Sequence, residues 1–199
     1  MKLIIASNNA HKIHEIKQIL AGKFDEMLSL FEAGVDHETV EDGTTFAENA
    51  LKKAREIAEI TGCAALADDS GLCVSALDGA PGVISARYAG GGVVHSTDAE
   101  NNALLLKNLE GVSDRRAYFI CAMALVYPDG KIVSAEGYMH GNIIDAPRGS
   151  QGFGYDPLFL PVGESRTVAE LSDAEKNAIS HRGKALEAMK IKLQNALQK

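Results

Sequence analysis

Two adjacent aspartates, Asp68 and Asp69, stand between an apolar run and a Ser-Gly pair in the stretch LADDSGL. A buried carboxylate must find a partner or take up a proton, and two neighbouring carboxylates repel each other. In an extended segment, consecutive side chains point to opposite faces, so the pair does not hold one metal ion head-on. We expect one aspartate to face a ligand cleft and the other to accept hydrogen bonds within the scaffold. Acid pairs also occur where a strand simply surfaces, and this segment alone leaves both interpretations open.

A polar segment near the N-terminus, SNNAHK at residues 7–12, could bind an anion. It follows the apolar residues 3–6 and precedes a helical pattern, so its backbone N–H groups and the helix dipole would face a ligand. It lacks the glycines and the Gly-Lys-Ser/Thr ending of a Walker A motif. A helix start capped by Asn8 or Asn9, with no ligand, would have the same sequence.

Glu41 and Lys53 lie in one stretch, EDGTTFAENALKKA. A carboxylate that binds Mg²⁺ and a lysine that meets phosphate would together make half of a phosphate site. A solvated surface pair would look the same. Thr45 and Glu48 have capping-box spacing, which predicts that a helix begins there and carries Asn49 and Lys53 on one side.

The segment GFGYDP could present an aromatic side chain from a loop. Its glycines and proline shape the backbone around Phe153, Tyr155 and Asp156. An aromatic ring on such a loop can stack on a nucleobase, whereas a turn with its aromatics folded into the core would have the same sequence.

The overall charge makes any basic cluster informative. Lys plus Arg number 20 against 27 Asp plus Glu, which gives a formal net charge of −7. Nucleic-acid binders normally carry the opposite balance, so we expect no nucleic-acid partner. Lys176, His181 and Arg182, in EKNAISHRGKA, could donate to the oxygens of a base or a phosphate, although basic residues on a helix are often only solvated.

The scaffold for these segments reads as an α/β protein with a mixed sheet. The 199 residues are 46% hydrophobic and show no repeat or linker, which predicts a single domain over residues 1–199. Strands are expected at residues 3–6, at 63–67 (ending at Asp68-Asp69) and in a hairpin over 116–141, and helices from about residue 10, from 45 to 61, from 97 to 109 and from 172 onward.

Three cysteines, none in a CxxC pair, indicate core thiols in a reducing compartment. The apolar start is too short for a signal peptide, and no run approaches the ~18 residues of a membrane span. We therefore expect a cytoplasmic protein without a membrane partner.

Taken together and in order, SNNAHK, EDGTTFAENALKKA, LADDSGL, GAPGVISARYAG, GFGYDPLF and EKNAISHRGKAL resemble the inosine triphosphate pyrophosphatase family. They run from Ser7 to Leu186, nearly the whole chain. The resemblance implies a long twisted mixed sheet with flanking helices in two lobes around a central nucleotide cleft, a homodimer and a requirement for Mg²⁺. The implied reaction converts a deaminated purine nucleoside triphosphate (ITP, dITP or XTP) and water into the monophosphate and pyrophosphate.

The resemblance also implies roles for particular residues. Glu41 and Asp69 would hold Mg²⁺, and Asp69 would be the general base. The substrate-binding residues would be Ser7, Asn8, Asn9, Ala10, His11, Lys12 and Lys53 at the phosphates, Ser70 on the nucleotide, and Phe153, Gly154, Tyr155, Asp156, Lys176, His181 and Arg182 at the base. Position 7 has serine where threonine is common, which keeps the hydroxyl, and position 151 has glutamine where glycine is expected.

Three other functions fit part of the same pattern. A pyrophosphatase for other modified nucleotides would use the same phosphate groups. A nucleotide-binding module without catalysis would need only the phosphate loop and a stacking Phe153, but it gains little from carboxylates such as Glu41 and Asp69 near the phosphates. A phosphatase that removes the terminal phosphate would release orthophosphate.

Overall fold

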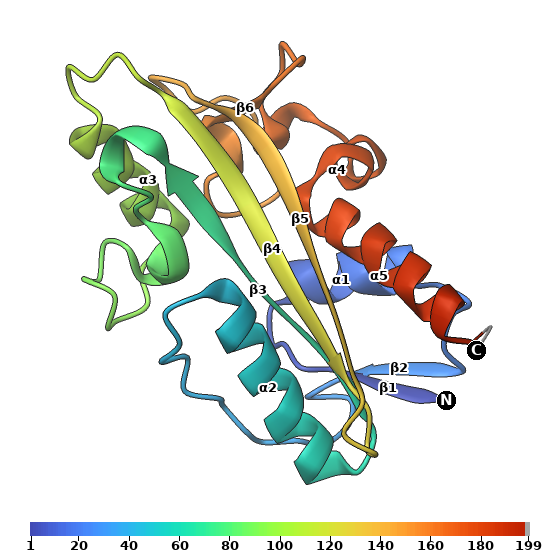
Figure 1. The fold of residues 1–199 in the computed structure, drawn as a ribbon. Coiled ribbons are helices and arrows are strands. Elements are labelled where there is room, and N and C mark those ends of the chain that lie inside the picture. Colours follow the sequence, from blue (N-terminus) through green and yellow to red (C-terminus); the bar gives the residue numbers. More distant parts are fainter. Residues whose placement is uncertain (198–199) are drawn as a thin grey trace. The chain divides into compact units, whose positions relative to one another are not determined.

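The computed structural model describes residues 1–197, with side chains as far as Gln194. Six strands form one sheet in the order β2-β1-β3-β4-β5-β6 (Figure 1). Strand β1 (Lys2–Ile5) pairs in parallel with β2 (Glu26–Ser29) and β3 (Ala64–Val74), whereas β5 (Ile132–Ile143) pairs antiparallel with β6 (Phe159–Pro161). The prediction of an α/β protein with a mixed sheet is therefore confirmed.

The chain divides into two compact units. Unit 1 comprises residues 1–69, 121–137 and 181–199, and unit 2 comprises residues 70–120 and 138–180. Strand β4 (Arg116–Val126), like β3 and β5, has residues in both. That the chain acts as one domain stays a prediction.

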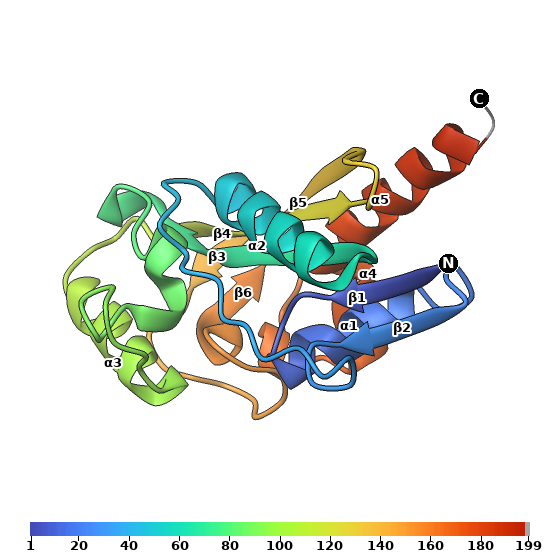
Figure 2. The ribbon, with the colours of Figure 1, turned by 90° about the horizontal axis from the view of Figure 1, so that it is seen from below.

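Unit 1 is a sheet covered by helices on both faces (Figures 1 and 2). Helices α1 (Ala10–Ile19) and α5 (His181–Leu197) lie together on one face, and α2 (Phe46–Thr61) covers the other. Alternate residues of the strands belong to the hydrophobic cores on opposite faces of the sheet. Leu3 and Leu66 pack toward α1 and α5, whereas Ile4 and Ala65 pack toward α2. This double burial explains why β1 is apolar without alternation.

The predicted helix starts are confirmed. Thr45 accepts from the backbone of Glu48 while the Glu48 carboxylate accepts from the backbone of Thr45, a complete capping box that begins α2. Capping boxes also begin α3 (Asp98–Asn108) at Thr97 and α4 (Asp173–Ile179) at Ser172. None of the helices within residues 1–197 combines the length and apolar character needed to cross a membrane.

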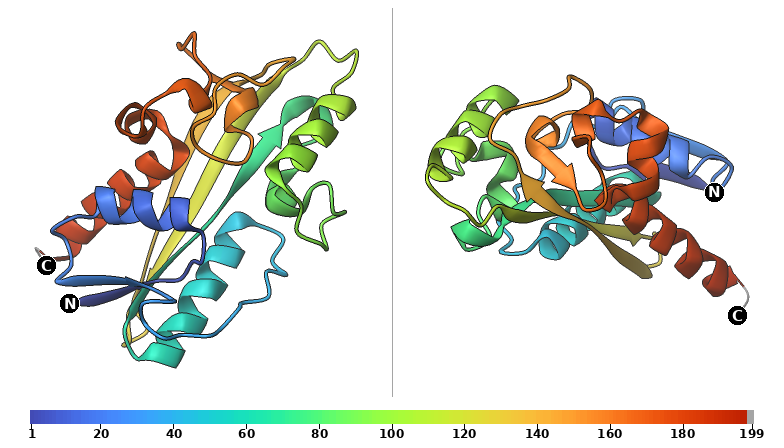
Figure 3. Two further views of the ribbon diagram at one scale, coloured as in Figure 1. Left: turned by 180° about the vertical axis from the view of Figure 1, so that it is seen from behind. Right: turned by 90° about the horizontal axis from the view of Figure 1, so that it is seen from above.

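Unit 2 has its own core, formed where α3 and β6 pack against the ends of the long strands (Figure 3). Leu72 and Val74 of β3, Leu105 of α3 and Phe159 of β6 are fully buried in it. Four short 3₁₀ helices connect these elements, at Ser75–Leu77, Gly82–Arg87, Asp156–Leu158 and Val168–Glu170.

Two predicted boundaries are wrong. Strand β3 does not end at Asp68-Asp69 but continues to Val74, because both aspartates find buried partners and the strand does not need to surface there. The helical C-terminus is not continuous either, since Ser180 is extended (φ −67°, ψ 155°) and separates α4 from α5. Gly137 of β5 lets α5 begin close to the sheet, since a Cβ there would lie 2.1 Å from the carbonyl oxygen of His181.

Candidate active site

The loop between β1 and α1 is a capped helix start whose residues 8–11 are exposed. The Asn9 side chain accepts from the backbone N–H groups of His11 (3.0 Å) and Lys12 (3.1 Å), which confirms one of the two predicted caps. The Ser7 hydroxyl accepts from the backbone N–H of Asn9 at 3.1 Å and so fixes the bend of the loop. The loop therefore presents the positive end of the α1 dipole to solvent, an arrangement that suits phosphate.

The two aspartates of β3 point to opposite faces of the sheet, as predicted. Asp68 is directed toward α1 and α5, where its Oδ2 lies 3.1 Å from the Lys12 Nζ and 3.1 Å from an Arg182 nitrogen. Asp69 is directed toward α2, where its Oδ2 accepts from the Asn49 Nδ2 at 3.0 Å. The pleat of the strand thus gives each carboxylate a different set of partners.

Asp68 is part of a buried ion-pair network, which we call the Asp68 network: Asp68, Lys12, Arg182 and Glu15. Arg182 is 1% exposed and donates both to Asp68 and to Glu15, the latter at 2.5 Å. Burial would raise the pKa of Asp68, but the charges of Lys12, Arg182 and Lys53 outweigh it and hold that pKa below its ordinary value. Asp68 is therefore an ionised scaffold group that joins α1 to α5.

Asp69 shares a lysine with Glu41. The Lys53 Nζ lies 2.6 Å from the Glu41 Oε1 and 3.8 Å from the Asp69 Oδ1. Burial raises the pKa of Asp69, and the charge of Lys53 only partly offsets that. Burial alone would lower the pKa of Lys53, but Asp69, Asp68 and Glu41 together raise it, so the ammonium stays charged at neutral pH. Because its pKa is raised, the Asp69 carboxylate is a stronger proton acceptor than an ordinary aspartate.

Asn49 fixes the positions of Asp69 and of the segment that carries Glu41. This side chain is 1% exposed, and its Oδ1 accepts from the backbone N–H of Gly43 at 2.8 Å while its Nδ2 donates to Asp69. A Cβ at position 43 would lie 2.6 Å from that oxygen, so the close approach requires glycine. One buried amide therefore holds the two predicted metal ligands in register.

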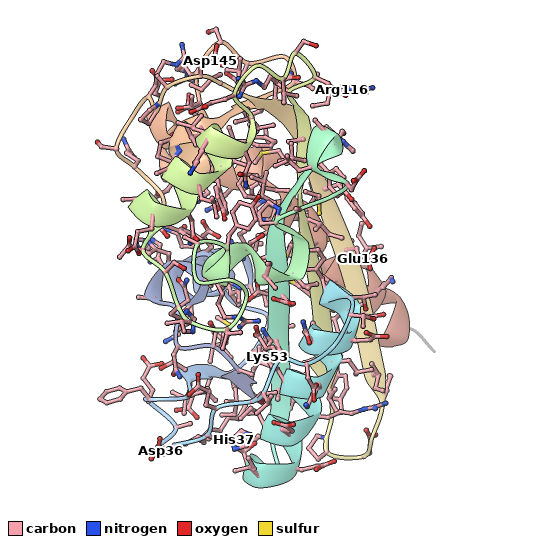
Figure 4. The ribbon with its side chains drawn as sticks, turned by 90° about the vertical axis from the view of Figure 1, so that its left-hand side faces the viewer. Asp36, His37, Lys53, Arg116, Glu136 and Asp145 are labelled. Atoms are coloured by element: carbon pink, nitrogen blue, oxygen red, sulfur yellow. The ribbon has the colours of Figure 1, made fainter. Side chains whose placement is uncertain are left out.

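Further polar pairs bind the segment before α2 to that helix; Figure 4 labels His37 in this segment and Lys53 on the helix. The His37 Nε2 lies 2.8 Å from a Glu56 oxygen that also accepts from the Thr39 hydroxyl at 2.6 Å, and Lys52 pairs with Asp42 at 2.7 Å. Residues 37–42 have no regular secondary structure, so these pairs, rather than a backbone ladder, hold the predicted metal ligand in place.

The Glu41 and Asp69 carboxylates fit a hard divalent cation. Within residues 1–197, no group of three or more His, Cys, Asp or Glu side chains could hold a metal ion by itself. Mg²⁺ is commonly held by only one or two carboxylates and completes its shell with waters and substrate phosphates. The pair already faces a cation, the Lys53 ammonium, so the donor set suits a metal that binds together with a polyphosphate.

In unit 2, the predicted base loop and Lys176 meet. The Asp156 Oδ2 accepts from the backbone N–H of Phe153 and from the Lys176 Nζ, both at 3.0 Å. The Lys176 ammonium also lies 4.6 Å from the centre of the Phe153 ring. A Cβ on Gly152, which has φ +75°, would lie 2.1 Å from the same Asp156 oxygen. Phe153, Asp156 and Lys176 therefore form one preorganised group.

The two aromatic residues of this loop lie in different environments. Tyr155 is 3% exposed, and its hydroxyl donates to the backbone carbonyl of Ser85 at 2.8 Å, so it belongs to the core of unit 2. Phe153 is only half-buried, which leaves it the better candidate for stacking on a base. The core interpretation is therefore confirmed for Tyr155, and stacking by Phe153 stays a prediction.

The remaining predicted site residues lie within β3 and at the start of α5. Ser70 is half-buried in β3, directly after Asp69. His181 and Arg182 begin α5 and are both buried, and the guanidinium of Arg182 contacts carboxylates in the Asp68 network. A role for Arg182 in base recognition stays a prediction. Sequence reasoning missed Glu15; its signal is an acid one helical turn from Lys12 beside the apolar stripe of α1.

Comparison with known proteins gives consistent results along the chain. The model of the Ham1 family matches residues 3–192. A dITP/XTP pyrophosphatase of Clostridium perfringens is 49% identical over 205 residues, covering 99% of each chain. A dITP/XTP pyrophosphatase of Geobacter sulfurreducens is 51% identical and covers 95% of this chain and 94% of its own. The structure of a HAM1 protein from Coxiella burnetii superposes with a TM-score of 0.87 at 43% identity, over 98% of this chain and 99% of the other.

Proposed function

The chain belongs to the Ham1 family, and on that premise we propose that it hydrolyses deaminated purine nucleoside triphosphates (ITP, dITP and XTP) to the monophosphate and pyrophosphate with Mg²⁺ as cofactor. The observation that carries the proposal is the group formed by Asp69, Lys53 and Glu41, in which two carboxylates face one buried ammonium. A protein that only bound a polyanion would gain little from two carboxylates beside the phosphates. A cytoplasmic location and a homodimer are part of the proposal.

The residues proposed for the phosphate and metal subsites all belong to unit 1. Residues 7–12 would bind the triphosphate through the start of α1 and the Lys12 ammonium, and Lys53 would turn from Glu41 to a phosphate oxygen. Glu41 and Asp69 would then hold Mg²⁺, which when bound offsets the charge of the phosphates and lowers the pKa of a coordinated water.

Proton transfer falls to Asp69 in this proposal. Hydrolysis requires a water molecule to lose a proton as it attacks phosphorus, and a carboxylate within hydrogen-bond reach accepts it. Asn49 keeps the Asp69 carboxylate oriented, since its amide donates to the Oδ2 at 3.0 Å. Asp68 does not serve as the base here, because its depressed pKa makes it a weak proton acceptor and its Oδ2 is already paired with Lys12 and Arg182.

Base selection follows from hydrogen bonding. Hypoxanthine and xanthine have an oxygen at C6, an acceptor, where adenine has an amino donor. Lys176 and Arg182 can only donate, so they would favour the oxo base and leave adenine mismatched. Phe153 would supply a stacking face that every purine shares, and therefore affinity rather than selectivity.

A single panel tests the proposal. ITP, XTP, GTP and ATP are each incubated with the protein and Mg²⁺, and pyrophosphate and orthophosphate are quantified separately. We expect pyrophosphate from ITP and XTP, little from GTP or ATP, and none after chelation of the metal. Release of orthophosphate would indicate a terminal phosphatase, and tight ITP binding without turnover would indicate a binding module. A modified pyrimidine nucleoside triphosphate is assayed beside the panel, and faster turnover of that nucleotide than of ITP would indicate a pyrophosphatase for other modified nucleotides.

The Asp69→Asn variant tests the assigned base. It preserves the shape of the side chain and removes its basicity, so kcat should fall by at least about 10²-fold while the fold is retained. Circular dichroism and thermal unfolding check the fold. A variant with nearly normal kcat would refute the role of Asp69.

A further inference from the structure

Helix α3 holds both polar groups of Gly154, the residue that follows Phe153. The backbone N–H of Gly154 donates to the Asp98 Oδ2 at 2.6 Å, and its carbonyl oxygen accepts from the Asn102 Nδ2 at 3.0 Å. Asp98 and Asn102 lie four residues apart and therefore share one face of α3. Both contacts join segments more than 50 residues apart in sequence, and both lie within unit 2.

We propose that Asp98 and Asn102 are positioning residues that set the Phe153 ring for the nucleobase. The proposal deepens the proposed function and rests on it, since it assumes that Phe153 contacts the base. Neither residue belongs to the segments that carry the family resemblance, and neither contributes to the phosphate or metal subsites.

The geometry around Phe153 supports this role. On its N-terminal side, the Phe153 N–H donates to Asp156, and on its C-terminal side the next residue is held by α3. Gly154 has φ +63°, a conformation that other residues rarely adopt, so the backbone beside the ring is held in a specific bend. Fixing the backbone on both sides limits the directions that the ring can take. A preordered ring loses less conformational entropy when a base stacks on it.

Within residues 1–197, the Asn102 side chain has one polar atom without a hydrogen-bond partner, which lowers the stability of the fold. Its Oδ1 is buried, and it has no hydrogen-bond partner among the described residues. Turning the amide over would place oxygen against the Gly154 carbonyl, so the donation to Gly154 fixes the orientation of the side chain. A leucine of similar size would remove the unsatisfied oxygen, but it would also remove the donor to the Gly154 carbonyl. Because Gly154 is only half-buried, water can replace that donor, so the two effects offset each other and the stability of the protein should stay close to that of the wild type.

That balance makes Asn102→Leu the diagnostic variant. We expect its thermal midpoint to stay close to that of the wild type, while KM for ITP rises by about threefold to tenfold, the loss of roughly one hydrogen bond, and kcat stays within about twofold. Asp98→Ala should raise KM similarly, whereas Asp98→Asn should restore most of the affinity, because its amide oxygen can still accept from Gly154.

The matched control is Asn108→Ala. Asn108 lies on the same helix and donates its Nδ2 to the Tyr88 hydroxyl at 2.8 Å, a contact that does not involve Phe153 or Gly154. Removing its amide should leave KM for ITP unchanged. An Asn102→Leu variant with wild-type KM, or an Asn108→Ala variant with the same rise in KM, would overturn the proposal.

A double-mutant cycle separates positioning from a general effect on unit 2. If Asn102 acts through the Phe153 ring, Asn102→Leu should have almost no further effect on KM in a Phe153→Ala background. Equal effects in both backgrounds would refute the mechanism. Failure of the proposed function would give different results. No pyrophosphate from ITP with the wild type would reject the proposed activity. A Phe153→Ala variant that retains the wild-type KM would reject the assignment of the base loop.

Discussion

Replacing Arg182 with methionine should destabilise the protein strongly. Arg182 is 1% exposed, and its guanidinium contacts two buried carboxylates, Asp68 and Glu15, which are 2% and 8% exposed. Methionine fills a similar volume but leaves both carboxylates without that cation. Removing one partner of a buried ion pair costs about 3–5 kcal/mol. Lys12 remains 3.1 Å from Asp68, so we expect a loss near the lower limit, about 3 kcal/mol.

A loss of that size is a large part of the ~5–15 kcal/mol that stabilises a typical domain. Urea denaturation at pH 7, followed by far-UV circular dichroism, measures it directly. Arg182→Lys should destabilise the protein less than Arg182→Met. It keeps the positive charge but loses the planar guanidinium that contacts two carboxylates at once. In a Glu15→Gln background, the cost of Arg182→Met should fall by about 1 kcal/mol or more, since one of the two charges it leaves unpaired is gone.

The effect should also depend on pH. Because the pKa of Asp68 is held below its ordinary value of 3.8, its stabilising contribution is fully present above about pH 4 and is lost as the pH falls below that. Without Arg182, the pKa of Asp68 rises toward its ordinary value and that contribution shrinks. The difference in stability between wild type and variant should therefore be largest at neutral pH and decrease below pH 4.

Two outcomes would refute the structural role of Arg182. One is a stability within about 1 kcal/mol of the wild type at pH 7, and the other is a difference that grows on acidification. Kinetics on the same variants test base recognition separately. If Arg182 reads the base, Arg182→Lys should narrow the ratio of ITP to ATP turnover, and if its role is only structural, both substrates should be affected equally.

The remaining predictions concern the metal subsite and the base loop. Lys53→Met should raise KM for ITP by about tenfold, because it removes a hydrogen-bond donor to phosphate. The same variant should bind Mg²⁺ more tightly in the absence of nucleotide, because the competing ammonium is gone. Calorimetry measures the Mg²⁺ affinity, and weaker binding would contradict the arrangement of Glu41 and Asp69 around this lysine. Gly152→Ala should raise KM for ITP with little change in kcat, because the new Cβ would lie 2.1 Å from the Asp156 oxygen that accepts from Phe153. An unchanged KM would show that the loop adapts to the extra methyl group.

The local features of the fold could be predicted because their causes lie within a few residues. The cap on α1 and the capping boxes at Thr45, Thr97 and Ser172 depend on side chains two or three positions from the groups they satisfy. The opposite orientation of Asp68 and Asp69 follows from the pleat of any strand. The end of β3 could not be predicted, because a pair of acids usually marks a surface, and only partners from other elements keep it buried.

The order of the amino acids is enough to show which chemical groups are present and on what kind of local element each lies. That information indicates the family and its candidate phosphate, metal and base segments. The tertiary structure decided which groups meet. Asp68 is paired with Arg182, 114 positions away, and Gly154 is held by Asn102, 52 positions away. Contacts over such separations depend on how the packed helices lie on the sheet, and no local periodicity specifies them. The division of the aspartate pair into a scaffold acid and a candidate base is therefore a property of the packed fold.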